Sequence, residues 1–196
     1  MAETLDPALS DDAPLAASRD QSKAADAAAA TLPEDKGDTL VGRTVTINKP
    51  RAELFAYWHD FANLAAFMEN VERIDMLDDK GSHWVVKGPN GPVEWNSTVT
   101  DERDGEYIAW ASEEGADVPN SGRVEFKDAG ARGTVVSVTI LYDPPAGFIG
   151  KAVAKMFQRE PAIQARRELR RFKQLMETGE IATGARNKRE LEERKG

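Results

Sequence analysis

The longest helical pattern in the chain is PPAGFIGKAVAKMFQREPAIQARRELRRFKQLMETGEI, Pro144–Ile181. Beyond Pro161, apolar residues recur at spacings of three and four and therefore share one face of a helix; they are Ala165, Leu169, Phe172 and Met176. Gly179 stands where a helix commonly closes on a left-handed residue, so the helix is predicted to end near Glu177 or Thr178. Its apolar face requires a partner surface from the rest of the chain.

Charge is distributed unevenly along the chain, whose formal net charge is −8. Residues 148–176 hold eight basic and two acidic side chains, a formal charge of +6, whereas residues 39–147 carry −8. One interpretation is a solvated helix face whose charge offsets an acidic sheet. The other is a surface for anionic lipid or RNA, for which interleaved aromatic residues would be stronger evidence. On the second interpretation the contact residues are Arg166, Arg170 and Lys173.

The length of 196 residues predicts one folded domain with two tails. Residues 1–37 are rich in Ala, Asp, Ser and Pro and lack aromatic side chains, which predicts a disordered acidic leader. The folded domain is expected to span residues 38–181, followed by a charged, disordered tail at 182–196. The sequence has no cysteine, no signal-peptide pattern and no run of about 18 apolar residues, so a cytoplasmic location is expected.

Strand and helix patterns begin directly after the leader. Thr39–Asn48, TLVGRTVTIN, has the alternation and β-branched content of a strand, and Pro50 suits the first turn of a helix. In Arg51–Met68 large apolar residues recur at helical spacing, while Asp60 and Asn63 interrupt the pattern. We therefore expect two short helices after the first strand.

Six further strands are predicted between Val71 and Tyr142, divided by turn sequences such as DDKG, GPNG and RDGE. They are Val71–Leu77, Ser82–Lys87, Val93–Arg103, Tyr107–Ser112, Gly122–Lys127 and Thr134–Tyr142. Consecutive strands joined by such turns imply an antiparallel meander, and the first strand brings the sheet to seven.

Side chains alternate between the two faces of a strand, so the sequence also predicts which residues face the core. The large apolar residues fall on one parity: Trp84, Val86, Val93, Trp95, Val99, Ile108, Trp110, Val124, Phe126, Val136, Val138, Ile140 and Tyr142. The opposite parity is mostly polar, which is typical of an antiparallel sheet with one face in water.

Together these elements predict an α+β helix-grip fold, in which a seven-stranded curved antiparallel sheet wraps around a long carboxy-terminal helix. The element order and four segments resemble the bacterial cyclase/dehydrase branch of the START-like (SRPBCC) superfamily, which is similar to coenzyme Q-binding START-domain proteins. The segments are SHWVVKGPNGPVEW (Ser82–Trp95), YIAWASEEGADVPNSGRVEF (Tyr107–Phe126), YDPPAG (Tyr142–Gly147) and RRFKQLMETGEI (Arg170–Ile181). The resemblance covers residues 38–181. It implies a cavity between sheet and helix, in a superfamily that includes lipid carriers, aromatase/cyclases and regulatory proteins.

Large apolar residues of the inward parity, and of the segment before the final helix, are the candidate ligand contacts. They are Trp84, Trp95, Trp110, Phe126, Tyr142, Phe148, Met156 and Phe157, with Ser97 and Tyr142 as polar points. Periodicity alone favours an ordinary core for these side chains. The resemblance shifts the expectation to a pocket for a hydrophobic small molecule.

Groups suited to acid–base catalysis or metal binding are scarce. His59 and His83 are the only histidines and have no metal-ligand spacing, and the neighbouring acidic pairs fall in expected turns. The inward parity contains no Asp, Glu, His or Lys. Glu94 is the one catalytic candidate to examine, because a one-residue bulge would turn it inward. No metal or cofactor is predicted.

Three functions fit the sequence. We rank first a non-enzymatic binding or carrier domain for a hydrophobic molecule such as a quinone, isoprenoid, acyl chain or polyketide. The second is an interaction module that uses the basic final helix on a membrane, the ribosome or a respiratory partner; no DNA partner is expected. The third is an aromatase/cyclase-like enzyme acting on a poly-β-keto chain, in which positioning supplies much of the rate gain.

Overall fold

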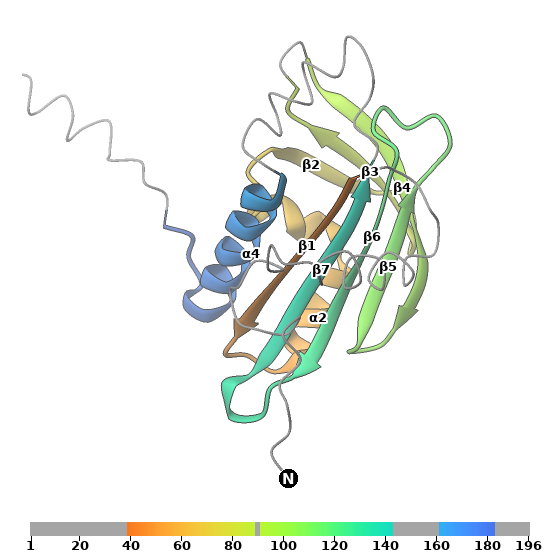
Figure 1. The fold of residues 1–196 in the computed structure, drawn as a ribbon. Helices are drawn as coiled ribbons and strands as arrows, with labels where there is room; N and C mark the ends of the chain where they lie inside the picture. The colour runs from red at the N-terminus through yellow and green to blue at the C-terminus, as the bar shows by residue number, and fades with distance from the viewer. Residues whose placement is uncertain (1–38, 89–90, 143–160, 183–196) are drawn as a thin grey trace, which may run out of the picture.

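The computed structural model describes residues 39–88, 91–142 and 161–182 (Figure 1). The leader predicted at residues 1–37 lies outside these ranges. So do residues 143–160, which open the long helical pattern, and residues 183–196 of the predicted tail. The structure therefore tests the central part of the predicted domain and does not test its boundaries.

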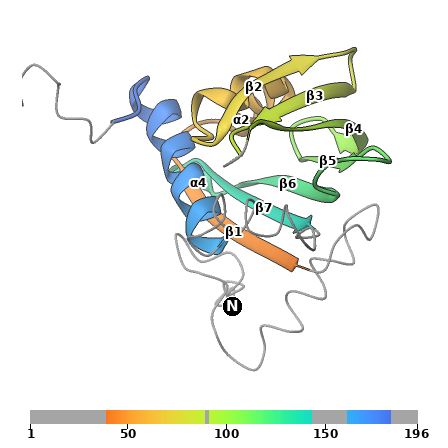
Figure 2. The same cartoon turned by 90° about the horizontal axis from the view of Figure 1, so that it is seen from above.

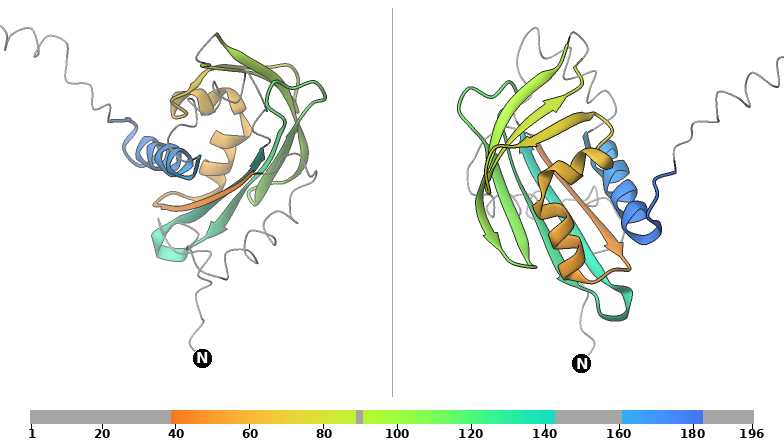
Figure 3. Two further views of the ribbon diagram at one scale, coloured as in Figure 1. Left: turned by 45° about the horizontal axis from the view of Figure 1, so that its top comes forward. Right: turned by 180° about the vertical axis from the view of Figure 1, so that it is seen from behind.

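The described residues form one seven-stranded antiparallel sheet. Its strands are β1 (Thr39–Ile47), β2 (Val71–Met76), β3 (Gly81–Val86), β4 (Val93–Arg103), β5 (Tyr107–Ser112), β6 (Asn120–Asp128) and β7 (Thr134–Tyr142). Their order in the sheet is β1-β7-β6-β5-β4-β3-β2, so β2 to β7 are a meander and β1 closes onto β7. The predicted meander is confirmed, and the sheet curves around the helices on its concave side (Figures 1 and 3).

Two helical segments follow β1, namely α2 (Arg51–His59) and the short 3-10 helix η2 (Phe61–Ala66). Pro50 precedes the first turn of α2 in an extended conformation, which suits its fixed φ angle. The helical conformation is interrupted at Asp60, whose carboxylate accepts a hydrogen bond from the backbone N–H of Ala62 at 3.2 Å. This side chain therefore ends one helix and caps the next, because it satisfies a backbone donor that the first turn leaves unpaired.

The carboxy-terminal helix α4 (Pro161–Thr178) packs against β1 at the edge of the sheet (Figure 2). Its end agrees with the prediction, because Gly179 has a φ of 78° and its N–H donates to the Leu175 carbonyl at 2.8 Å. Leu169 and Phe172 are buried on the apolar face, as the spacing predicted. Neither α4 nor the other described helices are long and apolar enough to cross a membrane.

Side chains outside the apolar face also hold α4 in place. The guanidinium Nε of Arg171 donates to the Phe67 carbonyl at 2.8 Å, and the Asn48 backbone N–H donates to the Glu177 carboxylate at 2.7 Å. These two contacts lie about one and a half helical turns apart and connect α4 to η2 and to the end of β1. The position of the helix is thus set by polar contacts as well as by its apolar stripe.

The predicted inward parity is correct where the structure describes it, since Trp84, Trp110, Val124 and Phe126 are buried. The prediction that the other face meets water is only partly correct. The outer-face residues Val85, Ala109 and Leu141 are also buried. Near Ala109, the Tyr107 hydroxyl donates to the carboxylate of Asp101, the strand partner of Ala109, at 2.9 Å.

Candidate functional site

Two tryptophans on adjacent strands form the centre of the candidate site. Trp84 of β3 lies opposite Trp95 of β4, and their indole rings stack with centroids 5.9 Å apart and an interplanar angle of 8°. The indole N–H of Trp84 donates to the Ser82 hydroxyl at 3.0 Å, which fixes the plane of that ring. Trp84 is buried, whereas Trp95 is only half-buried. The stack therefore presents aromatic surface that the described residues do not fully cover.

Phe61 of η2 joins this stack to a third tryptophan. Its ring meets Trp84 edge-on at 6.0 Å and Trp110 edge-on at 6.1 Å. Trp110 lies over Gly122 of the neighbouring strand, where a side chain would collide with the indole. Phe61 and the three strand residues therefore form a continuous aromatic surface on the concave side of the sheet. We call Phe61, Trp84, Trp95 and Trp110 the tryptophan surface.

The other half of the concave side is filled by packed rings. Trp58 of α2 contacts Phe67, Phe126 and Phe172 with centroid distances of 5.5, 6.3 and 5.1 Å. All four side chains are almost completely buried. The described part of α4 thus packs directly onto the core through Phe172. The rings of this half therefore present almost no surface to a ligand.

The predicted ligand contacts divide accordingly. Trp84, Trp95 and Trp110 lie together, whereas Phe126 belongs to the packed half around Trp58. Ser97 is buried on the concave side, and its hydroxyl donates to the Ala111 carbonyl at 3.0 Å. The remaining predicted contacts fall outside the side chains that the structure describes; they are Tyr142, Phe148, Met156 and Phe157.

Two residues near the tryptophan surface were not among the predicted contacts. Phe61 was assigned only to the helical pattern of Arg51–Met68, and its approach to two strands depends on how η2 folds back. Ser82 has the parity of Trp84 and could have been found from it. Its hydroxyl also donates to the Ser97 carbonyl at 3.3 Å, so it links β3 to β4. The named polar groups beside the tryptophan surface are neutral hydroxyls.

Glu94 lies on the outer face of the sheet. The β3–β4 register is continuous from Val86–Val93 to Gly81–Thr98, and the bulge in β4 falls later, between Val99 and Asp101. The Glu94 carboxylate is 46% exposed and lies 3.5 Å from His83 Nε2. It therefore faces away from the tryptophan surface, as the simple alternation predicted. Within the described ranges no group of three or more His, Cys, Asp or Glu side chains could hold a metal ion.

The basic residues of α4 play different parts. Arg171 and Arg167 connect α4 to the segment after η2, through the Phe67 carbonyl and through the Glu69 carboxylate at 3.2 Å. Of the predicted surface residues, Arg170 is exposed, and Arg166 and Lys173 are half-buried. The Nε atom of Arg166 is buried and has no hydrogen-bond partner within the part of the chain that the structure describes. On α2, burial raises the pKa of the Tyr57 hydroxyl, whose ring contacts Phe172 of α4, and the charge of Asp60 adds to the increase.

Comparison with known proteins agrees with this architecture. A family model described as polyketide cyclase/dehydrase and lipid transport matches residues 47–170. The crystal structure of DR_A0006 from Deinococcus radiodurans is 39% identical, with a TM-score of 0.59, and the match covers 72% of this chain and all of that one. An uncharacterized 17.2 kDa protein of Streptomyces lincolnensis is 24% identical over 153 residues, which are 74% of this chain and 93% of that protein.

The fold is shared with more distant proteins. The Zhui aromatase/cyclase from Streptomyces sp. R1128 is 16% identical with a TM-score of 0.56, and the match covers 74% of this chain and 99% of that one. At this identity the likeness concerns the fold alone. The match to the family model spans most of the described domain, including the tryptophan surface. The chain therefore belongs to the polyketide cyclase/dehydrase and lipid transport family, and its seven-stranded sheet and carboxy-terminal helix are consistent with the START-like helix-grip fold.

Proposed function

We propose that the chain is a non-enzymatic carrier that binds a hydrophobic small molecule against the tryptophan surface. The observation that supports this most directly is the half-buried ring of Trp95, stacked on the buried ring of Trp84. Aromatic surface on the concave side of a sheet is typical of small-molecule sites, which are mostly apolar with a few polar groups. The family description, which includes lipid transport, favours the same class of ligand.

The shape of the tryptophan surface favours a flat or extended apolar ligand. The half-buried indole of Trp95 is stacked parallel to that of Trp84, and the T-shaped contact of Phe61 helps hold Trp84 in place. A quinone, isoprenoid, acyl chain or polyketide would each suit such a surface. Covering 100 Å² of apolar surface contributes about 2.5 kcal/mol of binding free energy, before the costs of association. Neutral hydroxyls nearby can accept a hydrogen bond from a ligand without requiring a charge on it.

The test is ligand binding by the full chain purified without detergent. Native mass spectrometry should detect a co-purifying hydrophobic molecule, and a short-chain quinone should quench the tryptophan fluorescence saturably. Trp95→Ala should weaken quinone binding by about tenfold, because it removes the exposed member of the stack. Glu94→Ala is the matched control, since the neighbouring side chain faces the opposite side of the sheet. Equal binding by both variants, or no saturable binding by the unaltered chain, would contradict the proposal.

An aromatase/cyclase-like enzyme is the alternative for the same surface. The family description includes cyclases, and a pocket that orients a flexible poly-β-keto chain can accelerate its cyclisation with few catalytic groups. The side chain first considered as a catalyst, Glu94, faces away from the surface. Turnover of a poly-β-keto thioester, compared in the unaltered chain, Glu94→Gln and Tyr142→Phe, tests this alternative. If no turnover occurs, or if both variants leave it unchanged, this alternative should be dropped.

An interaction module is the second candidate, favoured by the formal charge of +6 over residues 148–176. Arg170, which is exposed, and the half-buried Lys173 are the residues to reverse in charge, whereas Arg167 and Arg171 link α4 to the segment after η2. Arg170→Glu with Lys173→Glu should weaken sedimentation with anionic vesicles, and the loss should shrink as salt is added. Sedimentation equal to that of the unaltered chain would count against this function.

A further inference from the structure

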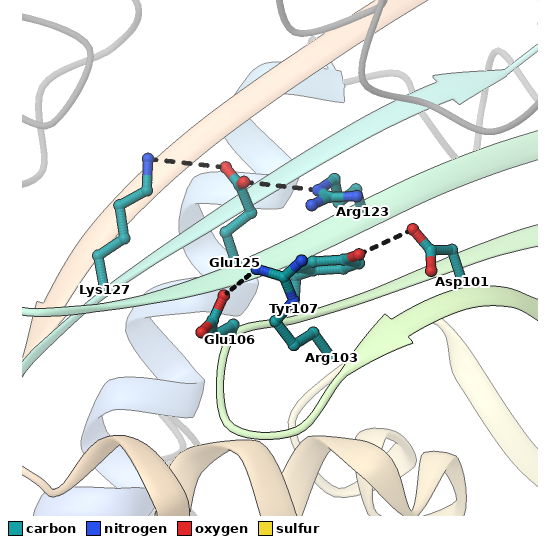
Figure 4. Close-up of polar contacts among 7 residues, drawn as sticks. All are labelled: Asp101, Arg103, Glu106, Tyr107, Arg123, Glu125 and Lys127. Atoms are coloured by element: carbon teal, nitrogen blue, oxygen red, sulfur yellow. Dashed lines mark hydrogen bonds and ion pairs between the residues drawn. The ribbon is translucent and has the colours of Figure 1, made fainter.

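A second concave feature lies at the end of the sheet around the β4–β5 turn, away from the tryptophan surface. It is a groove of about 470 Å³, bounded by the β4–β5 turn, the last residues of β6 and the start of α2 (Figure 4). Arg123, Glu125 and Lys127 alternate with inward residues along β6, and Tyr107 lies opposite Glu125 on β5, so all four side chains belong to the outer face. The groove is therefore separate from the tryptophan surface.

Arg123 is the central and least exposed cation of the groove. Its side chain is 15% exposed, and its guanidinium carbon lies 3.5 Å from the ring centroid of Tyr107. The Tyr107 hydroxyl donates to the Asp101 carboxylate at 2.9 Å, and Arg103 contacts the same ring at 5.8 Å. Because the ring is anchored by a hydrogen bond and carries the guanidinium on its face, Arg123 is held in one place.

The hydrogen-bonding capacity of Arg123 is largely unused. A guanidinium has five N–H donors. Only Nε has an acceptor in the described part of the chain, the Glu125 carboxylate at a long 3.4 Å. The terminal nitrogens, which carry the other four donors, have none. These terminal N–H groups can therefore pair with an acceptor that enters the groove.

The acidic side chains of the groove are already engaged. Glu106 accepts from Arg103 at 3.2 Å, and Asp128 accepts from the backbone N–H of Gly130 at 2.8 Å. Glu125 lies between two cations: its carboxylate is 3.4 Å from Arg123 Nε and a longer 4.0 Å from Lys127 Nζ. Arg51, at the start of α2, has no hydrogen bond or ion pair with the described residues. The unused groups of the groove are therefore donors.

We infer that this groove is a second binding site, for a small molecule that carries a carboxylate. The terminal N–H groups of Arg123 form a planar fork whose geometry matches the two oxygens of a carboxylate. Four cations and three carboxylates line the groove, so its formal charge of about +1 suits a monoanion better than a phosphate dianion. The volume is in the range of sites for small organic ligands. The site is independent of the proposed carrier function.

The test uses the full chain labelled with ¹⁵N, whose arginine Nε–Hε resonances report on each guanidinium. Sodium acetate and inorganic phosphate are titrated separately, with sodium chloride added to hold the ionic strength constant. Acetate should shift the Arg123 resonance saturably, with a smaller shift at Arg51. Phosphate should bind more weakly than acetate. The absence of a saturable shift, or tighter binding of phosphate, would overturn the assignment.

Variants separate the groove from general charge effects. Arg123→Lys keeps the charge but removes the fork, and should weaken acetate binding by about tenfold. Lys127→Gln, at an exposed side chain, should weaken it by about twofold without disturbing the fold. Arg132→Lys, on the exposed turn after β6 and outside the groove, is the matched control and should leave binding unchanged. For Arg123→Lys and Lys127→Gln, binding is read from backbone amide shifts at the β4–β5 turn. Equal binding by Arg123→Lys and Arg132→Lys contradicts the inference.

Discussion

The indole ring of Trp110 lies directly over Gly122, its partner residue on the neighbouring strand. A Cβ atom at residue 122 would come within 3.0 Å of three indole atoms, a separation that real Cβ atoms essentially never show. The glycine is therefore required by the close approach of a ring, which the missing side chain permits. This relationship allows Trp110 to lie close against the neighbouring strand, and its ring makes a T-shaped contact with Phe61.

Gly122→Ala should lower the free energy of unfolding by about 1–3 kcal/mol, because the added methyl group must displace a packed ring. Urea denaturation measures the change. The same substitution in a Trp110→Leu background should cost less, since the colliding indole is gone. Equal costs in the two backgrounds would mean that the ring is not the cause.

A comparison of Trp58 with Trp84 can measure how much an unpaired indole N–H group costs in folding free energy. Both are buried on the concave side, but the Trp58 indole N–H has no hydrogen-bond partner among the described residues, whereas that of Trp84 donates to Ser82. Trp84→Phe should therefore destabilise the fold by about 1–2 kcal/mol more than Trp58→Phe, which removes an unsatisfied group. The two urea midpoints give the comparison. A larger loss for Trp58→Phe would show that its N–H is satisfied in solution.

Asp78 should contribute a pH-dependent part of the stability. The backbone N–H groups of Lys80 and Gly81 donate to its carboxylate at 2.8 and 2.6 Å and lower its pKa from the ordinary value of 3.8. A pKa that is lower in the folded state stabilises the fold above pH 3.8, and this contribution is lost as the pH falls through the lowered value.

The stability advantage of the unaltered chain over Asp78→Asn should accordingly be constant near neutral pH and shrink under acidic conditions. Urea unfolding at a series of pH values measures the difference. A titration of the Asp78 carboxyl carbon by NMR gives the pKa independently. A difference in stability that does not change with pH, or a pKa at or above 3.8, would refute the role assigned to these two hydrogen bonds.

Gly179 should be sensitive to side-chain addition for a conformational reason. Its φ of 78° is the left-handed region, and its N–H closes the end of α4 on the Leu175 carbonyl. Gly179→Ala should cost about 1 kcal/mol of unfolding free energy, whereas Gly179→Asn should cost less because asparagine tolerates this conformation better. Thermal unfolding of the two variants compares them. An alanine variant as stable as the asparagine variant would be inconsistent with a left-handed cap.

The regular elements could be predicted because they depend on local patterns. Alternation assigned Trp84, Trp95 and Trp110 to one face, and helical spacing with Gly179 located the end of α4, since both follow from fixed geometric periods. The bulges near Val71 and at Val99 were not predicted, because a bulge leaves no strong local signal.

Contacts between segments that are distant in the sequence determine which residues make up the candidate site. The sequence by itself determined the seven strands, the face of the sheet on which each side chain lies, and the resemblance to a helix-grip family. Only the tertiary structure placed Phe61 of η2 between Trp84 and Trp110, and moved Phe126 into the packed half beside Trp58. The outer groove around Arg123 is likewise tertiary, because it combines three strands with the start of α2. Periodicity specifies which face a side chain occupies, but its neighbours on that face depend on how the sheet curves and where the helices pack.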